Sequence, residues 1–439
     1  MSPFYVAHKK GVFEMDYFET EYSKEIIKQL DRLTLYNSIN SDPVIGYLRN
    51  ICNQENKDEN ISKLISKLVE NAERFGFHGN LLKKHILNLF LYNENRFSLY
   101  CENNKNVENT SLYKLAVNDI KILKSLISIE LSSFCSDNGS VFIIQDYTPV
   151  NKTENELLSY IDTVYGEDEL LSSFIRYYKT LGCGDISLYR SFKFDDEKGK
   201  ITGILEPDNI TFDDIIGYEP QTKELINNTE AFVKGFPANN VLLVGSRGTG
   251  KSSSVKALVN KFYPDGLRLI EITKEQIVKL PDLLAMLKTR GRKFIIFIDD
   301  LSFDEQEIQY KYMKSLLDGG SESKPENVLF YATSNRRHLV QEKWSDRQRG
   351  SDDAEIHTQD TLNEKLSLAD RFGITITYPK PTPQEYVNIV KIMAKRYEIP
   401  LSDETLEKEA IKWEMSQKGI SGRTAKQFIN NLVWQTKNV

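Results

Sequence analysis

The chain has 439 residues, enough for two or three domains, and its 40% hydrophobic and 27% charged content is ordinary for a soluble globular protein. The net charge of −6 argues against a protein that binds nucleic acid mainly through bulk charge, although a local basic patch remains compatible with it. The four cysteines are far apart and form no C-x-x-C pair, so neither structural zinc nor a disulfide framework is expected. The apolar runs are too short to span a bilayer and the N-terminus lacks signal-peptide features, so we expect a cytoplasmic protein without membrane contact.

Residues 1–205 are predicted to form a mostly helical domain. Apolar residues recur every three or four positions along Ile61–Val69 and Ile120–Leu131, which is typical of amphipathic helices that pack in a core. The short apolar run Val141–Ile144 is compatible with a lone strand. This half contains no catalytic constellation, and a role in partner recognition is an expectation by analogy.

Residues 206–380 alternate between strand and helix patterns. This alternation predicts an α/β fold in which a parallel sheet is flanked by helices, with ligands bound at the carboxyl ends of the strands. Residues 381–439 return to a helical pattern, and Thr382-Pro383-Gln384-Glu385 is a strong helix-start signal. The candidate strands are 240–244, 267–272, 293–298, 327–332 and 373–378.

The segment Gly245–Ser252 reads G-S-R-G-T-G-K-S and matches the phosphate-binding loop G-x-x-x-x-G-K-S. An apolar strand pattern, Val241–Val244, precedes it and an amphipathic helix pattern follows it, as a phosphate cradle requires. Lys251 is suited to reach the β- and γ-phosphates of ATP, and the hydroxyl of Ser252 is suited to hold Mg²⁺. The alternative, an ordinary glycine-rich turn between a strand and a helix, does not require the Lys-Ser pair.

A second chemical motif is an apolar strand that ends in two acids, Phe294–Asp300. A strand that is apolar on both faces suits the middle of a parallel sheet, and its carboxyl end then lies beside the phosphate loop. We therefore expect Asp299 to hold Mg²⁺ opposite Ser252, and Asp300 to polarise the attacking water. Alternatively, both acids are helix caps or solvated residues at the end of a strand.

The phosphate-binding loop is followed along the chain by the strand that ends in two acids, and residues 211–436 as a whole resemble an AAA+ ATPase. Four further segments carry the resemblance, namely Thr211–Tyr218, Ala332–Asn335, Leu368–Gly373 and Gly419–Arg423. More narrowly, Asp300–Phe303, Leu317–Gly320 and Ala332–Leu339 resemble a bacterial family of predicted ATPases labelled domain of unknown function 815.

The resemblance implies roles for individual residues. Asn335 would be sensor 1 and orient the water, Arg371 would be the arginine finger inserted by a neighbouring subunit, and Arg423 would be sensor 2. The segment Thr211–Tyr218, which enters the ATPase domain and is called the entry segment below, would hold the adenine. The residues expected to contact the nucleotide are Ile216, Gly217, Gly245, Ser246, Arg247, Gly248, Thr249, Gly250, Lys251, Ser252 and Ser253.

Several alternatives stay open for these residues. Arg371 could instead be a surface charge at a helix end, Arg423 could lie against solvent, and Asn335 could be a turn former. Arg336 or Arg337 could take the finger role. Many relatives carry Glu where Asp300 stands, so either the water lies closer here or hydrolysis is slow, with Asp304 or Glu305 as possible assistants.

The sequence therefore predicts an ATP-binding protein and an ATPase that couples Mg-ATP hydrolysis to remodelling of an unidentified protein or nucleic-acid partner. A homo-oligomer is expected, with a ring as one arrangement. The alternative is a nucleotide-gated switch or binding module with little intrinsic hydrolysis. A small-molecule kinase is a weaker prediction, because it would not need the sensor, finger and lid residues together. The resemblance carries no known substrate.

Overall fold

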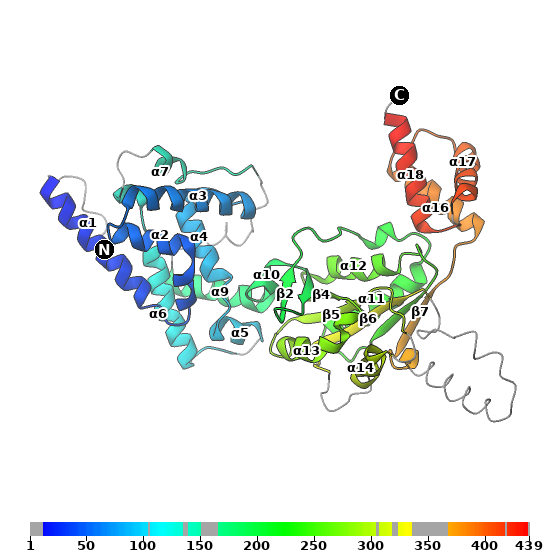
Figure 1. Ribbon diagram of the computed structural model, residues 1–439, viewed down its shortest axis with the longest axis horizontal. Coiled ribbons are helices and arrows are strands. Elements are labelled where there is room, and N and C mark those ends of the chain that lie inside the picture. Colours follow the sequence, from blue (N-terminus) through cyan, green and yellow to red (C-terminus); the bar gives the residue numbers. More distant parts are fainter. Residues whose placement is uncertain are drawn as a thin grey trace. The chain divides into compact units, whose positions relative to one another are not determined.

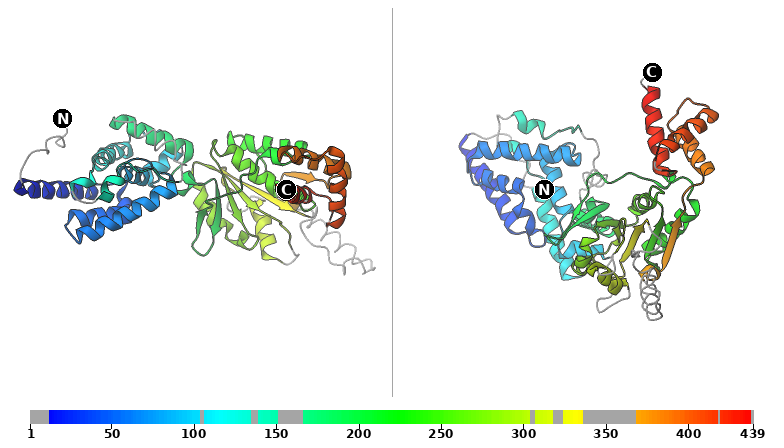
Figure 2. Two further views of the ribbon diagram at one scale, coloured as in Figure 1. Left: turned by 90° about the horizontal axis from the view of Figure 1, so that it is seen from above. Right: turned by 45° about the vertical axis from the view of Figure 1, so that its right-hand side comes forward.

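The chain forms two compact units, Met1–Ser187 and Leu188–Val439 (Figures 1 and 2). The structure is a computed structural model, and it describes residues 12–103, 106–134, 139–150, 166–303, 307–317, 324–335, 368–417 and 419–437. Each unit has a hydrophobic core of its own.

The first unit is predominantly helical in its described residues. Its helices are α1 (Val12–Asp31), α2 (Pro43–Cys52), α3 (Lys57–Phe75), α4 (Leu81–Leu91), α5 (Arg96–Glu102), α6 (Ser111–Leu126), α7 (Gly139–Ile143), α9 (Glu167–Leu181) and α10 (Asp185–Leu188), the last of which ends on the first residue of the second unit. The predicted apolar stripes lie in the core: α3 buries Ile61, Leu64 and Leu68, and α6 buries Ile120 and Leu123. No helix in the described part of the chain is both long enough and apolar enough to cross a membrane.

The strand prediction for Val141–Ile144 is wrong, because this segment forms the short helix α7 and the turn after it. Val141 and Ile144 are buried, whereas Phe142 and Ile143 between them are more than half exposed. Burial at positions i and i+3 is the pattern of a helix, and a run of four apolar residues is too short to distinguish the two periods.

The second unit is built on a seven-stranded sheet with the order β2-β1-β4-β5-β6-β3-β7. The strands are β1 (Ser191–Asp195), β2 (Lys200–Gly203), β3 (Val241–Gly245), β4 (Leu267–Ile272), β5 (Lys293–Ile298), β6 (Val328–Ser334) and β7 (Ile374–Tyr378). All neighbouring strands are parallel except β2, which is antiparallel to β1. The five predicted strands are β3 to β7, so the α/β fold with a parallel sheet is confirmed.

Strands β1 and β2 are additions that the sequence pattern did not indicate. They extend the sheet beyond β4, and they belong to the second unit, which begins at Leu188 and not near the predicted boundary at residue 206. In β1, Phe192 and Phe194 are buried and Lys193 between them is exposed. A single five-residue alternation is a weak signal next to a helical domain.

Helices cover both faces of the sheet, as a parallel sheet requires. On one face, α11 (Glu219–Val233) and α12 (Lys251–Phe262) share a core with alternate residues of β3 to β7. Figures 1 and 2 show α13 (Leu280–Lys288) and α14 (Ile308–Leu317) on the other face. Strand β5 is buried on both faces from Phe294 to Ile298, which fits its central position.

A bundle of three helices lies where the sequence predicts a helical lid, and it is called the lid below. It consists of α16 (Pro383–Arg396), α17 (Asp403–Ser416) and α18 (Gly422–Lys437), which share an apolar cluster. The predicted start of the first of these helices is confirmed: Thr382 and Glu385 form a reciprocal capping box with Pro383 in the first turn. Ile216, from the segment that enters the sheet domain, packs against the same cluster.

The pairing of β3 with β7 leaves no room for a side chain at Gly245. Its φ is +149°, and a Cβ there would lie 2.1 Å from the carbonyl oxygen of Tyr378 on the neighbouring strand. Gly245→Ala should therefore lower the free energy of unfolding by more than about 2 kcal/mol, because backbone must move. Scanning calorimetry of the full chain measures the effect.

Gly235→Ala is the matched control, since Gly235 also has a positive φ, +82°, but open space where the Cβ would lie. Its free energy of unfolding should fall by only about 1 kcal/mol, the cost of placing alanine in a left-handed backbone conformation. Equal melting temperatures for the two variants would contradict the predicted clash.

Candidate functional site

The site lies where three adjacent parallel strands, β5, β6 and β3, reach their carboxyl ends. In this register Leu243 of β3 pairs with Thr333 of β6, and Phe297 of β5 pairs with Tyr331 of β6. Because side chains alternate between the faces of a strand, Asp299 and Thr333 lie on the same face as the buried Phe297 and Tyr331. That face is the one covered by α12.

The segment after β3 forms a loop that ends at the N-terminus of α12. Gly248 and Gly250 have φ values of +79° and +91°, a conformation that favours glycine. Because α12 begins at Lys251, its unpaired N–H groups and the positive end of its dipole lie at the loop, which is the arrangement of an anion site. The sequence-predicted phosphate loop thus has the local geometry that phosphate binding requires.

Lys251 is buried, with 6% of its surface exposed. Its Nζ donates to the carbonyl oxygens of Gly245 (2.8 Å) and Ser246 (2.9 Å) and to Oδ1 of Asn335 (3.1 Å). Burial lowers the pKa of this ammonium group, while the nearby carboxylates of Asp299 and Asp300 act in the opposite direction. The cation is therefore held in the cradle by oxygen atoms that a phosphate group could replace.

The carboxylate of Asp299 accepts hydrogen bonds from two hydroxyl groups at the predicted metal site. Its Oδ1 accepts from the Ser252 hydroxyl at 2.7 Å and from the buried Thr333 hydroxyl. Magnesium prefers carboxylate, hydroxyl and water oxygens, so the Ser252–Asp299 pair fits this ion. The described residues hold no group of three or more His, Cys, Asp or Glu that would indicate a second kind of metal site.

Asp300 follows in a left-handed backbone conformation, with φ +53°, which is uncommon for a residue other than glycine. Its Oδ1 accepts from Nδ2 of Asn335, and its Oδ2 lies 3.6 Å from Nη2 of Arg247. Asn335 thus contacts Lys251 through its oxygen and Asp300 through its nitrogen, joining the phosphate loop to the second acid. Asp300 remains more than half exposed, so solvent water can reach it.

The entry segment and the lid meet at the phosphate loop. A Cβ on Gly250 would lie 3.4 Å from Ile215, and one on Gly217 would lie 3.9 Å from Ile389 of the lid. The backbone N–H of Arg423, at the start of α18, donates to the carbonyl of Gly248 at 3.3 Å. The structure therefore places Ile215 and the backbone of Arg423 beside the loop, whereas Ile216 and Gly217 lie against the C-terminal helices. That these residues contact a nucleotide stays a prediction.

Arg371 is the predicted site residue that does not join this group. It lies just before β7, whose first residue, Ile374, pairs with Val241 at the start of β3, whereas Gly245 at the end of β3 pairs with Tyr378. The amino and carboxyl ends of these strands are about 13 Å apart. Arg371 therefore lies near the amino ends of the strands, whereas the phosphate loop of its own chain lies at their carboxyl ends.

Other predicted candidates lie outside the described residues. These are Asp304, Glu305, Arg336 and Arg337, together with the polar segment 341–364.

Thr333 contacts both acids, although the sequence analysis did not single it out. The available signal was its spacing: in a strand, Thr333 lies on the same face as Asn335, two residues later.

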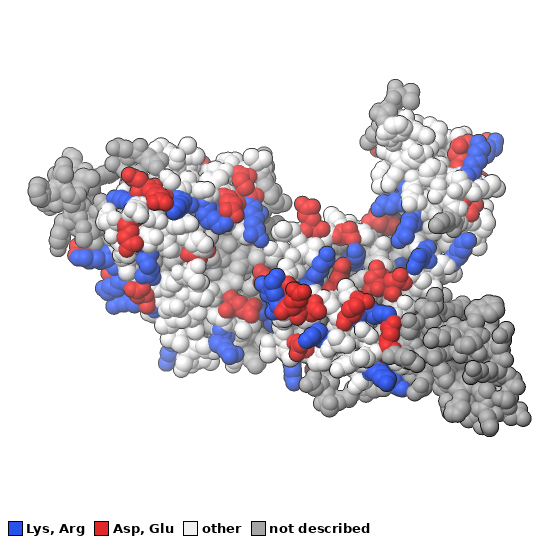
Figure 3. Space-filling view, viewed as in Figure 1, with Lys and Arg blue, Asp and Glu red and all other residues white. Residues whose placement is uncertain are grey.

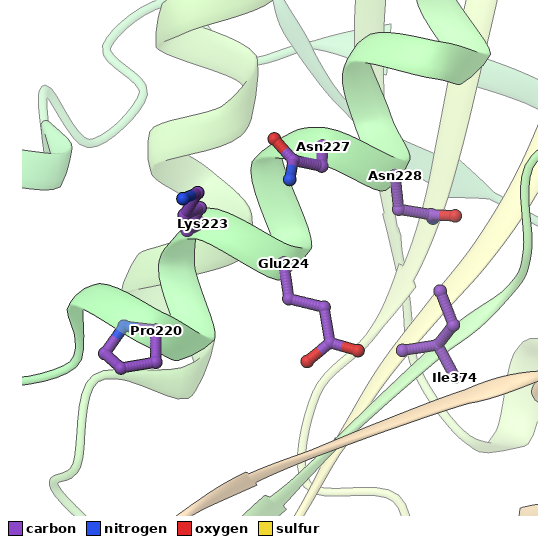
Figure 4. Close-up of a pocket in the computed structure, with 6 residues that line it drawn as sticks. All are labelled: Pro220, Lys223, Glu224, Asn227, Asn228 and Ile374. Carbon is purple, nitrogen blue, oxygen red and sulfur yellow. The ribbon is translucent and has the colours of Figure 1, made fainter.

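A hollow at the surface of the described residues lies away from this site. It has a volume of about 540 Å³ and lies between one face of α11 and the start of β7 (Figure 4). None of the predicted site residues lines it; the lining residues are Pro220, Lys223, Glu224, Asn227, Asn228 and Ile374. Charges of both signs alternate over the face shown in Figure 3, without a massed basic surface there.

The sheet order, the phosphate loop after β3, the two acids after β5 and the helical lid define a P-loop NTPase fold of the AAA+ type. Within that class, residues 187–436, more than half of the chain, match the family described as protein of unknown function (DUF815). The chain belongs to this family, as its motifs suggested.

Solved structures of the RuvB Holliday junction branch migration motor of Thermotoga maritima are also similar. One is 17% identical, with 52% of this chain and 71% of that chain covered and a TM-score of 0.34. A single-residue variant of the same protein is 20% identical, with 52% and 72% covered and the same TM-score. Such distant likeness supports no assignment of function. Among curated proteins, none matches the sequence.

The contact between the loop and the lid predicts an effect of Gly248→Ala. A Cβ on Gly248 would lie 2.9 Å from Oγ of Ser421 and 3.1 Å from Cβ of Arg423, at a positive φ that alanine disfavours. The substitution should separate the start of α18 from the loop and speed amide hydrogen exchange there by about tenfold in the nucleotide-free chain.

Arg423→Ala is the control for this exchange experiment. It removes the side chain but keeps the N–H that bonds to Gly248, so exchange at the start of α18 should stay within about twofold of wild type. Unchanged exchange in Gly248→Ala would show that the loop does not hold the lid.

Proposed function

We propose that this protein binds ATP with Mg²⁺ and hydrolyses it, and that it couples the cycle to remodelling of a protein or nucleic-acid partner. The observation that carries the proposal is the Ser252–Asp299 pair beside Lys251, at the carboxyl edge of a parallel sheet. A phosphate cradle and a magnesium ligand pair in direct contact are what phosphoryl transfer needs. Membership of the AAA+ class supports ATP over other phosphates.

In the proposed site the chain binds and orients the nucleotide. The loop N–H groups and Lys251 would hold the phosphates, Ser252 and Asp299 would hold Mg²⁺, and the Ile216–Gly217 segment would lie against the base. The Mg²⁺ would neutralise developing charge on the phosphate oxygens. Arg423 would sense the nucleotide from the lid, since its backbone already contacts the loop.

Asp300 would accept a hydrogen bond from the attacking water, with Asn335 orienting it. Two groups hold the Asp300 carboxylate, the Asn335 amide and the Arg247 guanidinium, and both come from elements that would contact the γ-phosphate. A bound triphosphate would therefore compete for the partners of Asp300. This competition links nucleotide binding to the position of the acid that the reaction needs.

Arg371 could act only on the site of a second subunit, because it lies at the far edge of its own sheet. An arginine fork suits a γ-phosphate because it stays charged and binds two oxygens at once. The proposal therefore includes a homo-oligomer in which Arg371 completes the neighbouring site.

The second candidate function is a nucleotide-gated switch with little hydrolysis. The observation that favours it is Asp300 itself, whose side chain is one methylene shorter than Glu and is engaged by Asn335 and Arg247. In that case nucleotide binding would move the lid while the γ-phosphate persists. Steady-state turnover in the presence and absence of a captured partner separates the two functions.

Two variants test the site. Lys251→Ala should weaken Mg-ATP binding at least about 100-fold, because it removes the buried cation of the cradle. Asp300→Asn should bind Mg-ATP within about threefold of wild type but turn it over about 10² to 10⁴ times more slowly, the usual range for loss of a general base. Calorimetric titration and a phosphate-release assay measure the two effects.

Lys261→Ala is the matched control, because Lys261 lies on the same helix, is exposed, and is remote from the loop in sequence. It should bind and turn over ATP like the wild type. Full activity in Lys251→Ala or Asp300→Asn would refute the assignment of the site.

Mixing subunits tests Arg371. Arg371→Ala and Lys251→Ala should each lose turnover by about 10³-fold, in the range of arginine-finger effects. Mixed together they should regain part of it, because a subunit with an intact loop receives Arg371 from its neighbour. The assay is phosphate release as a function of mixing ratio.

Lys251→Ala mixed with Asp300→Asn is the control, since every site in that mixture carries a lesion and no activity should return. The trans role of Arg371 fails if its mixture with Lys251→Ala gives only the sum of the separate activities.

A further inference from the structure

Thr333 is a buried residue of β6, with 2% of its surface exposed. Its Oγ1 accepts from the backbone N–H of Asp300 at 2.9 Å and donates to Oδ1 of Asp299. One hydroxyl therefore lies between the predicted metal ligand and the predicted water-polarising residue.

The direction of both hydrogen bonds is fixed by chemistry. A backbone N–H can only donate and an ionised carboxylate can only accept, so the single Thr333 proton must point to Asp299. The same Asp299 oxygen accepts from Ser252, and the Asp300 N–H also reaches it at 3.2 Å. The Thr333 hydroxyl accepts from the Asp300 N–H and donates to Asp299, and these two hydrogen bonds fix its orientation.

The main chain of Thr333 adds a third bond at this point. Its carbonyl accepts from the backbone N–H of Leu301 at 2.7 Å. Thr333 thus holds the amides on both sides of the Asp300 carbonyl, where the backbone has its unusual φ of +53°. Such a conformation persists only when its surroundings over-determine it.

We propose that Thr333 is a positioning residue that couples the metal-binding carboxylate of Asp299 to the backbone of Asp300. This inference rests on the proposed function and deepens it. Thr333 sets the orientation of the Asp299 oxygen that faces Ser252 and, through its bond to the Asp300 amide, the direction in which Asp300 points. The two hydrogen bonds of its hydroxyl go to Asp299 and Asp300 and not to the phosphate loop or the lid.

The inference predicts a specific pattern in Thr333→Val, which keeps the shape of the side chain but lacks the hydroxyl. In the nucleotide-free chain, amide exchange at Asp300 should rise at least tenfold, because its N–H loses the hydroxyl that accepts from it. With nucleotide, the Mg²⁺ concentration needed for half-maximal ADP binding should rise at least threefold, and ATP turnover should fall at least tenfold. ADP affinity in excess EDTA should stay within twofold, because the phosphate cradle is unchanged.

Thr333→Ser restores the hydroxyl and should recover all four measurements to within threefold of wild type. Thr229→Val is the matched control: Thr229 is also fully buried and hydrogen-bonded through its hydroxyl, but to Leu225 and Tyr331, away from the acids. It should leave Mg²⁺ dependence and Asp300 exchange unchanged. If Thr333→Val does not fold, as judged by circular dichroism, Thr333→Ala serves in its place.

Wild-type amide exchange and Mg²⁺ dependence in Thr333→Val would overturn the inference, as would a Thr333→Ser variant as impaired as Thr333→Val. Either result, in a chain whose wild type binds Mg²⁺ and ADP, leaves the proposed function intact. A wild-type chain that binds no Mg²⁺-nucleotide overturns the proposed function and with it the coupling role.

Discussion

The arrangement of the site depends on the register between β6 and its two neighbours. Strand β6 pairs with β5 on one side and with β3 on the other, and this places Asp299, Thr333 and the start of the phosphate loop in one row. A slip of β6 by one residue would turn Thr333 and Asn335 to the other face of the sheet. Lys251 would then lose its bond to Asn335, and both acids would lose their shared hydroxyl partner.

The strands that set this register could be predicted because they are buried on both faces. Phe294–Ile298 and Val241–Val244 are continuous apolar runs, a pattern that suits the centre of a parallel sheet. Strand β1 at the periphery was missed, since its five residues alternate and its pairing with β4 joins segments far apart in the sequence. Val141–Ile144 was misread as a strand because four apolar residues fit either period.

The same distinction applies to the site. The loop residues and Asp299 follow from local motifs, since glycines, Lys251 and Ser252 are contiguous and Asp299 ends an apolar strand. Thr333 could not be found in this way, because its contacts with Asp299 and Asp300 arise from pairing between strands more than thirty residues apart. A role for Arg371 stays a prediction, since a single chain holds this residue near the amino end of β7, away from its own phosphate loop.

Lys251 shows why binding and hydrolysis would be linked in this site. Its ammonium group donates to two carbonyl oxygens and to the side-chain oxygen of Asn335, whose amide nitrogen donates to Asp300. A phosphate oxygen bound to Lys251 would release the Asn335 oxygen, so the restraint on Asp300 would change at the moment the substrate arrives. On the proposed function, the extent of this change at Asp300 would distinguish a motor from a switch, and the hydrogen bond from the Asp300 amide to Thr333 would limit it.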